Sequence, residues 1–407
     1  MDLGDIQLIS GAEGRHLLDQ LPPYEAALAV KLLDGLRKRG IDPKMAAAAL
    51  TQSRLRTAAR TKFGPFADQM LFTEAGLQQS TRLSVAAHHA ARYLRAEVGC
   101  VADLTGGIGG DVLAMAGLGL RVICYEQDPV TAAVARANLA AFPEVKVIQA
   151  DSLEADLTGA DALYADPSRR TQAGRRIFDP AAYQPPLQAL LELAQNRPLG
   201  VKVGPGLPHS AIPAAAEAQW VSVDGTVVEA GLWFGPLRQV VDAAAGTSDT
   251  DGPFRTALVM RGSATHRLAE AGELRLAAGP LDEFIYEPDG AVIRAHLLAE
   301  AAAELADPHL VAPNIAYITS HTELATSPFL AGYRVVDHFP FGLKRLAAYL
   351  RERSIGELTI KKRGTAVEPA ELRKRLKLKG DGSMVAILTR LGTQQSVVVV
   401  EALGRKP

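Results

Sequence analysis

The chain has 407 residues, 48% of them hydrophobic and 22% charged, with a formal net charge of -1. This length favours about two to four domains, and the composition is typical of a soluble globular protein. Its two cysteines, Cys100 and Cys124, are too few for a disulfide framework or a zinc cluster.

The charge is unevenly distributed along the chain. Residues 331–407 hold 16 Lys+Arg against 7 Asp+Glu, whereas residues 1–330 hold 28 against 38. A basic segment fits either a polyanionic partner or an ordinary solvated surface, and charge alone leaves both open. The acidic start MDLGDIQLIS has no apolar signal region, and no apolar run approaches the roughly 20 residues of a membrane span. We therefore expect a cytoplasmic protein without a membrane segment.

The first part of the chain, residues 1–83, predicts a helical region. Apolar residues recur every three or four positions in ALAVKLLDGLRKRG and PKMAAAALTQSRLRTAARTKFG. Gly40 and Gly64 are expected to end two of these helices.

Residues 84–262 alternate between apolar strands and helices. The predicted strands are VGCVADLT, RVICYEQD, VKVIQAD, DALYADP and LGVKVGP. Strands that are apolar on both faces indicate a parallel sheet with helices on both sides, which binds ligands at the carboxyl ends of its strands. We expect AQWVSVDGTVVEAGLWFG and FRTALVMRG to close this sheet as antiparallel strands.

Two smaller parts complete the chain. Residues 270–330 read as a short β-α-β block made of EFIYEP, IRAHLLAEAAAELA and IAYITS. Residues 331–407 mix strands with two basic helices, GLKRLAAYLRERS and PAELRKRLKLKG. The predicted fold class is α/β: a Rossmann-like sheet with an N-terminal helical region and small α+β C-terminal domains.

A glycine-rich turn, ADLTGGIGGD at residues 102–111, follows the first predicted strand. A P-loop needs a lysine after its last glycine, but Gly110 is followed by Asp111. A dinucleotide site needs a further glycine where Val112 stands, and Asp111 would repel a pyrophosphate. S-adenosylmethionine has no phosphate and is cationic, so acidic groups favour it.

Acidic residues follow the predicted strands at the places where such a cofactor needs them. Asp103 can face its ammonium group, Glu126 can accept from the ribose hydroxyls, and Asp151 from the adenine amino group. The cofactor-binding candidates are Asp103, Thr105, Gly106, Gly107, Gly109, Asp111, Glu126, Gln127, Asp151 and Ser152.

Across residues 84–262 the sequence resembles the class I S-adenosylmethionine-dependent methyltransferases. Their motif after the first strand is D/E-x-G-x-G-x-G, and here it begins at Asp103 with Thr105 in place of the first glycine. The resemblance implies a class I methyltransferase sheet and S-adenosylmethionine as cofactor, with the Thr105 hydroxyl beside the methionine carboxylate.

The fourth predicted strand ends in YADPSRR, which resembles the [DNS]PP[YFW] motif of methyltransferases that act on exocyclic base amines. The resemblance implies that Asp166 and Pro167 hold the amino group in line with the methyl group. Ser168 replaces the second proline and Arg169 the stacking aromatic residue, so the target base stays open. The substrate-binding candidates are Lys202, which is within reach of the site, and four arginines suited to phosphates, namely Arg169, Arg170, Arg175 and Arg176. A solvated loop is the alternative for the arginines.

Three more segments resemble parts of nucleic-acid methyltransferases. FTEAGLQQSTRLSVAAHHAARYL resembles a segment that closes over the cofactor, with Gln79 and Thr81 as candidates, although a helix N-cap explains it equally well. Residues 331–403, with LTIKKRG and ELRKRLKLKG, resemble the THUMP-like domain of a bacterial group of these enzymes, and residues 270–330 resemble its small ferredoxin-like domain. THUMP domains proper bind structured RNA, so the resemblance implies an RNA partner, tRNA or rRNA.

Three functions remain open from the sequence. The first is methylation of a base nitrogen of structured RNA. The second is an RNA-binding protein that binds S-adenosylmethionine without catalysis, and the third is methylation of a protein or small molecule. No metal is expected, and the sequence leaves the modified nucleotide and the oligomeric state open.

Overall fold

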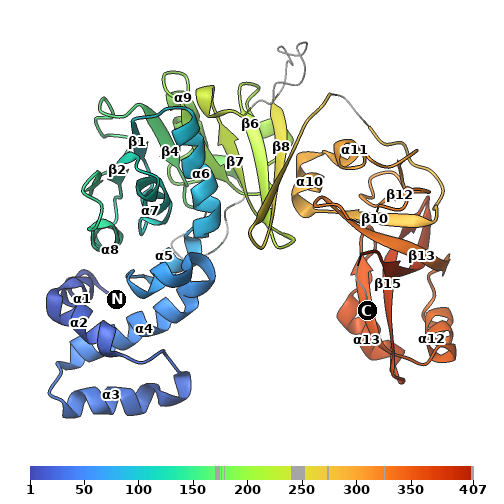
Figure 1. The fold of residues 1–407 in the computed structure, drawn as a ribbon, viewed down its shortest axis with the longest axis horizontal. Helices are drawn as coiled ribbons and strands as arrows, with labels where there is room; N and C mark the ends of the chain where they lie inside the picture. The colour runs from blue at the N-terminus through green and yellow to red at the C-terminus, as the bar shows by residue number, and fades with distance from the viewer. Residues whose placement is uncertain are drawn as a thin grey trace. The chain divides into compact units, whose positions relative to one another are not determined.

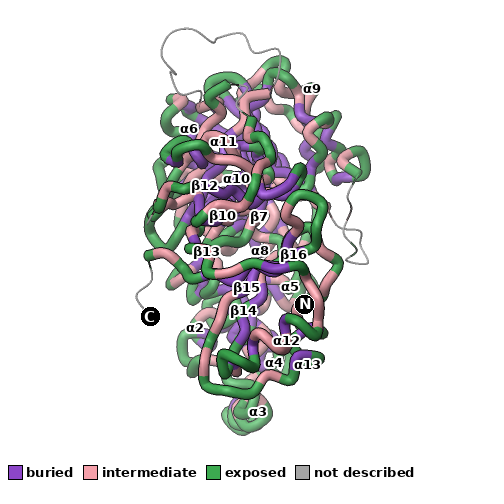
Figure 2. Tube along the Cα trace, turned by 90° about the vertical axis from the view of Figure 1, so that its right-hand side faces the viewer, coloured by how far each residue is buried: buried purple, intermediate pink, exposed green. Residues whose placement is uncertain are grey.

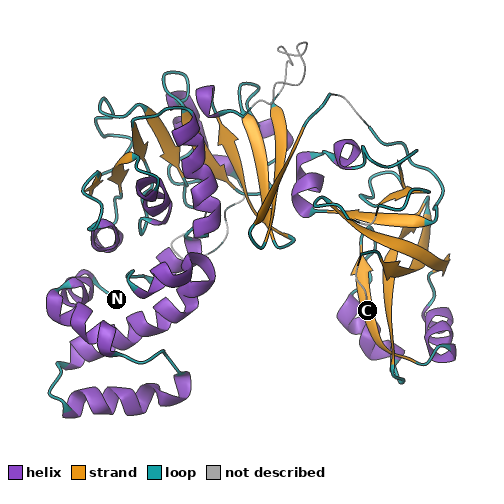
Figure 3. Ribbon diagram, in the orientation of Figure 1, coloured by secondary structure: helices purple, strands orange, loops and turns teal. Residues whose placement is uncertain are grey.

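The computed structural model of the chain describes residues 1–169, 175, 177, 179–239, 253–272, 275–324 and 326–404. These residues form two compact units. The first consists of Met1–Leu207 and Gly231–Gln239, and the second of Pro208–Ala230 and Val240–Pro407. Helices dominate the first 95 residues, whereas strands dominate the C-terminal half of the chain (Figure 3).

The first unit begins with helices, as predicted. They are α1 (Leu3–Ser10), α2 (Ala12–Gln20), η1 (Ala26–Leu28), α3 (Ala29–Lys38), α4 (Pro43–Phe63), η2 (Gly64–Asp68), α5 (Glu74–Gln79) and α6 (Leu83–Arg95). Asp42 caps α4 by accepting from the Met45 N–H at 3.0 Å, and Gly64, at φ 56°, ends it. The helices α1, α2 and α3 pack on α4, and α1 also contacts α8 (Figure 1). The helix α3 is mostly exposed and buries Leu36 (Figure 2).

A parallel sheet follows, in the order β3-β2-β1-β4-β5. Its strands are β1 (Cys100–Asp103), β2 (Arg121–Tyr125), β3 (Val145–Ile148), β4 (Ala162–Ala165) and β5 (Leu199–Val203). The end of β7 (Thr226–Trp233) belongs to the same unit, where the Phe234 N–H donates to the Leu199 carbonyl at 2.9 Å. The predicted alternation of strands and helices is confirmed.

Helices connect and cover this sheet. They are α7 (Gly110–Gly117), α8 (Pro129–Leu139), η3 (Pro180–Ala182), α9 (Leu187–Leu193) and η5 (Gly235–Leu237). The helix α6 packs on α7, which contacts α8 and β2. The core beneath them includes Tyr93, Tyr164 and Trp233, whose side chains are at most 2% exposed. The carboxyl end of β1 therefore lies within a packed α/β core.

The second unit contains η4 (His209–Ala211), β6 (Glu217–Val223), most of β7, β8 (Phe254–Arg261) and β9 (Ala264–Ala269). The antiparallel prediction for these strands is wrong in one place, because β6 and β8 pair in parallel. The pair β8–β9 is antiparallel. A parallel pair needs a long connection, and the chain between β6 and β8 supplies it.

A second sheet has the order β11-β12-β10-β13-β16-β15-β14. Its strands are β10 (Phe284–Pro288), β11 (His309–Leu310), β12 (Ile318–Ser320), β13 (Leu330–Pro340), β14 (Ile355–Lys362), β15 (Gly382–Leu391) and β16 (Gln394–Ala402). Because β10 pairs with both β12 and β13, the predicted boundary at residue 330 crosses one continuous sheet. The β10–β12 pair is antiparallel, unlike the neighbouring strands of a β-α-β unit.

Four helices accompany this sheet: α10 (Gly290–Ala295), α11 (Leu298–Ala301), α12 (Leu343–Glu352) and α13 (Pro369–Leu376). The single helix predicted from IRAHLLAEAAAELA is split, because His296 adopts a left-handed φ of 60°. The two predicted basic helices are confirmed as α12 and α13, and both contact β14. Within the described ranges, none of the helices is long and apolar enough to cross a membrane.

We predict that Gly200→Ala destabilises the first unit. An added Cβ would lie 2.5 Å from Cζ3 of Trp233 and 2.6 Å from the hydroxyl oxygen of Tyr93. Overpacking of this kind costs about 1–3 kcal/mol of unfolding free energy, measurable by chemical denaturation. Gly117→Ala is the matched control, because Gly117 lies in α7 with no neighbouring heavy atom within 4 Å of the new Cβ. Equal stability of the two variants would contradict this packing.

Candidate active site

The glycine turn between β1 and α7 has a fixed backbone shape. Gly107 and Gly109 have φ angles of 53° and 86°, which side chains rarely adopt. A Cβ on Gly106 would lie 2.2 Å from Sγ of Cys124, and the Gly106 N–H donates to the Tyr125 carbonyl at 2.8 Å. The glycines thus hold the turn against the end of β2.

Thr105 joins the ends of β1 and β4. Its N–H donates to Oδ1 of the buried Asp103 at 2.9 Å, and its hydroxyl oxygen accepts from the Asp166 N–H at 2.6 Å. The residue that departs from the glycine motif is therefore a bridge between the first and fourth strands.

Asp103 lies in surroundings that disfavour its charge. Burial raises the pKa of its carboxyl group to about 8, and the neighbouring charges of Asp111 and Asp166 also raise it. The hydrogen bond from Thr105 opposes this shift. The Asp103 carboxyl group is consequently mostly protonated at neutral pH.

Glu126 follows β2 and faces the glycine turn. Its Oε2 accepts from the Gly107 N–H at 2.9 Å, and its Oε1 accepts from the Asp128 N–H at 2.8 Å. Burial raises the pKa of the Glu126 carboxyl group, against these backbone hydrogen bonds. Glu126 is therefore hydrogen-bonded to the glycine turn and held in place beside it.

The other cofactor candidates lie after β2 and β3. Gln127 and Asp151 are exposed, and Ser152 is buried. Oδ1 of Asp151 accepts from the Leu153 N–H at 3.0 Å, which shapes the turn after β3.

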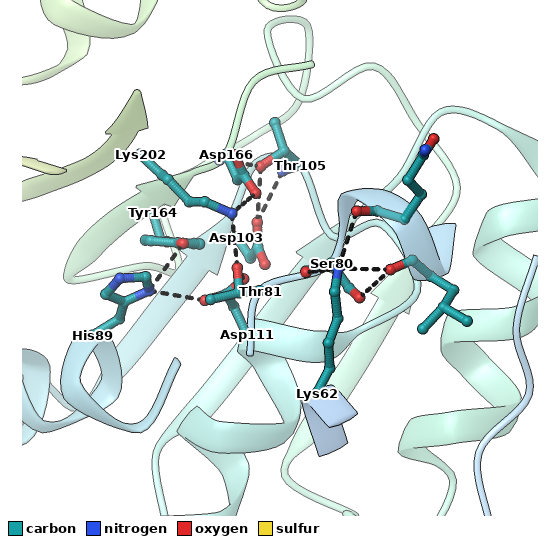
Figure 4. A network of polar contacts seen from close by, with 12 residues as sticks. Lys62, Ser80, Thr81, His89, Asp103, Thr105, Asp111, Tyr164, Asp166 and Lys202 are labelled. Atoms are coloured by element: carbon teal, nitrogen blue, oxygen red, sulfur yellow. Dashed lines mark hydrogen bonds and ion pairs between the residues drawn. The ribbon is translucent and has the colours of Figure 1, made fainter. Parts of the chain in front are cut away.

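Asp111 is buried in the first turn of α7. Its Oδ2 accepts from the Thr81 hydroxyl at 2.7 Å, and its Oδ1 lies 2.9 Å from Nδ1 of His89 (Figure 4). The Tyr164 hydroxyl lies 3.2 Å from the same nitrogen. Burial alone would raise the pKa of the Asp111 carboxyl group, but the bond to and charge of His89, together with Lys202 and Thr81, lower it to about 2. Asp111 is thus a fixed anion inside the unit.

Asp166 and Lys202 form an ion pair at the ends of β4 and β5. Lys202 is 6% exposed, and its Nζ donates to Oδ2 of Asp166 at 2.6 Å and to the Thr81 hydroxyl at 2.9 Å (Figure 4). Burial raises the pKa of the Asp166 carboxyl group, while the charges of Lys202 and Arg169 oppose the rise. Lys202, which was predicted to bind substrate, thus contacts the predicted catalytic acid.

The chain after Asp166 contains the predicted substrate loop. Pro167 is buried, and Ser168 exchanges two backbone hydrogen bonds with Gln184. Arg169 is half-buried and Arg175 is exposed. Arg170 and Arg176 lie outside the described residues.

Two residues that the sequence reasoning did not identify belong to this network. His89 contacts Asp111 and Tyr164, and Lys62 donates to carbonyls of the segment before Thr81. Lys62 lies in no motif, and His89 lies within the segment FTEAGLQQSTRLSVAAHHAARYL but was not singled out there. Only the placement of α4 and α6 beside the turn could have revealed them.

Comparisons with known proteins show the family. The chain is 33% identical over 336 residues to an uncharacterized S-adenosylmethionine-dependent methyltransferase of Mycobacterium tuberculosis, matched in two strains. The match covers 80% of this chain and 86% of the relative. The chain belongs to the S-adenosylmethionine-dependent methyltransferases. It is a methyltransferase, and its cofactor is S-adenosylmethionine.

Other comparisons concern the overall fold and the N-terminal and C-terminal segments of the chain. The crystal structure of a candidate methyltransferase from Porphyromonas gingivalis W83 matches with a TM-score of 0.75 and 21% identity, covering 100% of both chains, which shows a shared fold. The family described as THUMP domain-like matches residues 330–402, which confirms the predicted C-terminal resemblance. A domain of unknown function, DUF8688, matches residues 2–59.

The arrangement of the methyltransferase fits this cofactor. Burial and the charges of Asp111 and Asp166 raise the pKa of Asp103, so a positive ligand would stabilise its ionised form. The cofactor carries positive charge on a sulfonium and an ammonium group. The Cβ position of Gly107 meets one atom within 4 Å, the Thr105 carbonyl oxygen at 3.7 Å, so the backbone is approachable there. Glu126 is held beside this backbone as an acceptor.

We predict that cofactor affinity rises with pH up to about 8 through Asp103. A cationic ligand stabilises the carboxylate, whose pKa is about 8 in the ligand-free chain, so binding below that pH must release a proton. The affinity should increase by up to about tenfold per pH unit and level off above pH 8, as measured by calorimetry. In Asp103→Asn the part of the pH dependence that comes from the Asp103 carboxyl group should vanish. The part that comes from titration of the ligand itself should remain, so this variant serves as the control. The same pH slope in both proteins would contradict the assignment.

Proposed function

We propose that this methyltransferase transfers a methyl group to a base nitrogen of structured RNA, tRNA or rRNA. The observation that carries the proposal is the position of Asp166 after β4, beside the glycine turn, with one carboxylate oxygen bound to Lys202. The other oxygen, Oδ1, is the atom we assign to the N–H of the substrate base.

In the proposed reaction Asp166 and Pro167 orient the nucleophile. The amine donates its hydrogen atoms to Oδ1 of Asp166 and to the Pro167 carbonyl, which directs its lone pair along the line of displacement. When bound, S-adenosylmethionine supplies a methyl group on a sulfonium that leaves as a neutral thioether. The C–N bond would form as the S–C bond breaks, and the methylated nitrogen would then lose one proton to solvent water.

The contacts around the turn support the following cofactor roles. Asp103 is assigned to the ammonium group, and Glu126 to the ribose hydroxyls. For Asp111 the contacts support a different role from the predicted one, because Asp111 is buried, unlike the half-buried Glu126, and both of its oxygens are engaged by Thr81 and His89. We assign Asp111 to the support of the site.

The remaining predicted cofactor contacts complete this assignment. Gln127 and the turn after β3 are proposed to contact the adenine. The turn contributes Asp151 and Ser152.

The RNA substrate is supported by the C-terminal sheet and its charge. The THUMP-like match spans residues 330–402, and residues 331–407 carry the surplus of basic residues. A group of exposed cations lies on α13 and directly after it, namely Arg373, Lys374, Arg375, Lys377 and Lys379. Clustered cations of this kind favour phosphate contacts. Arg169 and Arg175, which follow Asp166 in the chain, are also proposed to contact phosphates, as are Arg170 and Arg176, which lie outside the described residues.

We predict that Asp166→Ala lowers kcat while it leaves cofactor binding nearly intact. Loss of a group that orients the reacting atom costs about 100- to 1000-fold in kcat. The assay is transfer of labelled methyl from S-adenosylmethionine to RNA from a strain that lacks the gene, with the cofactor Kd measured in parallel. Asp179→Ala, in the exposed cap of η3, is the control.

Two outcomes of this assay would count against the proposal. An equal loss of kcat and cofactor affinity in Asp166→Ala would place Asp166 in cofactor binding. A labelled product that resists RNase would exclude RNA as the acceptor and favour a protein or small molecule.

A further inference from the structure

We propose that Thr81 is a positioning residue for methyl transfer, whose hydroxyl group aims Lys202 at Asp166. The inference rests on the proposed role of Asp166. It assigns a task to the polar residue before α6 that differs from the predicted cofactor contact or helix cap.

The Thr81 hydroxyl has its single proton committed to Asp111. It donates to Oδ2 of Asp111 at 2.7 Å, so a lone pair remains directed at Nζ of Lys202, which donates to it at 2.9 Å. Thr81 is 5% exposed and Lys202 6%, so water does not substitute freely for either partner. The Thr81 hydroxyl therefore links Lys202 to Asp111 through two hydrogen bonds.

Asp111 is a rigid anchor for this hydroxyl group. It lies in the first turn of α7, and its other oxygen is 2.9 Å from Nδ1 of His89. The ring of His89 in turn lies against Tyr164, with the ring centroids 5.7 Å apart. Both oxygens of Asp111 are thus held, which restricts rotation of its carboxyl group.

A lysine ammonium on a flexible stem needs two contacts for a defined position. The ion pair alone leaves Lys202 able to follow Asp166 as that side chain moves. The Thr81 hydroxyl adds a contact from a different segment of the chain, and Nζ donates to Oδ2 of Asp166 at 2.6 Å (Figure 4). Oδ1 is then presented to the substrate in one orientation.

The N-terminal helices hold the segment that carries Thr81. Nζ of Lys62, near the end of α4, donates to the carbonyls of Leu77, Gln78 and Ser80 at 2.8, 3.0 and 2.6 Å. All three protons of this ammonium group are used on one short segment. The helical region thus contributes to the site through Thr81.

The test compares Thr81→Val, which removes the hydroxyl at nearly constant shape, with Thr81→Ser, which keeps it. We expect Thr81→Val to lower kcat by about 10- to 100-fold, as for a lost hydrogen bond to a charged group, with the cofactor Kd changed less than twofold. Thr81→Ser should restore most of kcat. Thr57→Val is the matched control, because that hydroxyl bonds to the Ser53 carbonyl within α4.

A second readout needs no substrate. In the ligand-free methyltransferase, the reactivity of the Lys202 amine toward acetic anhydride is measured by peptide mass spectrometry. We expect it to rise several-fold in Thr81→Val and in Lys62→Met, and to stay low in Thr81→Ser. In the double variant Thr81→Val/Lys202→Met, kcat should fall no further than in Lys202→Met alone.

Three outcomes separate this inference from the proposed function. Unchanged kcat and unchanged Lys202 reactivity in Thr81→Val would overturn the positioning role, and so would additive losses in the double variant. Increased Lys202 reactivity together with full activity of Asp166→Ala would instead overturn the role of Asp166, while Thr81 would still be shown to hold Lys202.

Discussion

The site depends on how the protein compensates three carboxyl groups that lie close together with little contact with water. Asp103, Asp111 and Asp166 lie where burial disfavours negative charge and where like charges repel each other. The structure handles each one differently. Asp166 is paired with Lys202, Asp111 is bonded to His89, and Asp103 is left with a pKa of about 8. The glycine turn, α6 and the ends of the strands position the groups that determine the charge of each of these carboxyl groups.

This distribution explains why the methyltransferase suits a cationic cofactor. Asp103, the carboxyl group with the raised pKa, gains most from a positive ligand, whereas Asp111 and Asp166 are already compensated by protein groups. A phosphate ligand would meet the reverse situation, since it adds negative charge to the same place. We therefore propose that the specificity of the turn lies in its acids, while the glycines provide its shape.

Much of the fold was predictable because its signals are local. Apolar strands in strict alternation with helices predicted the parallel sheet, and this sheet is confirmed. The parallel pairing of β6 with β8 could not be predicted, because it depends on the path of the chain between them. The left-handed His296 that divides a predicted helix also has no signal in the apolar pattern.

The site was predictable only where it follows from topology. Acids after consecutive parallel strands must gather at one edge, which placed Asp103 and Asp166 correctly beside the turn. The bonds of Thr81 to Asp111 and of Lys202 to Asp166 span 30 and 36 residues of sequence, and no periodic pattern connects such positions. The first contact is set by the packing of α6 on α7 and the second by the pairing of β4 with β5, and both became visible only in three dimensions.

The central claim is that the methyl group goes to a base nitrogen of RNA. The most direct measurement is mass spectrometry of the nucleosides of total RNA from cells with the gene, without it, and with the gene carrying Asp166→Ala. The account predicts that one N-methylated nucleoside disappears without the gene, returns with the wild-type gene and does not return with the variant. Identical nucleoside profiles in all three, with labelled methyl found in protein or small molecules, would contradict it.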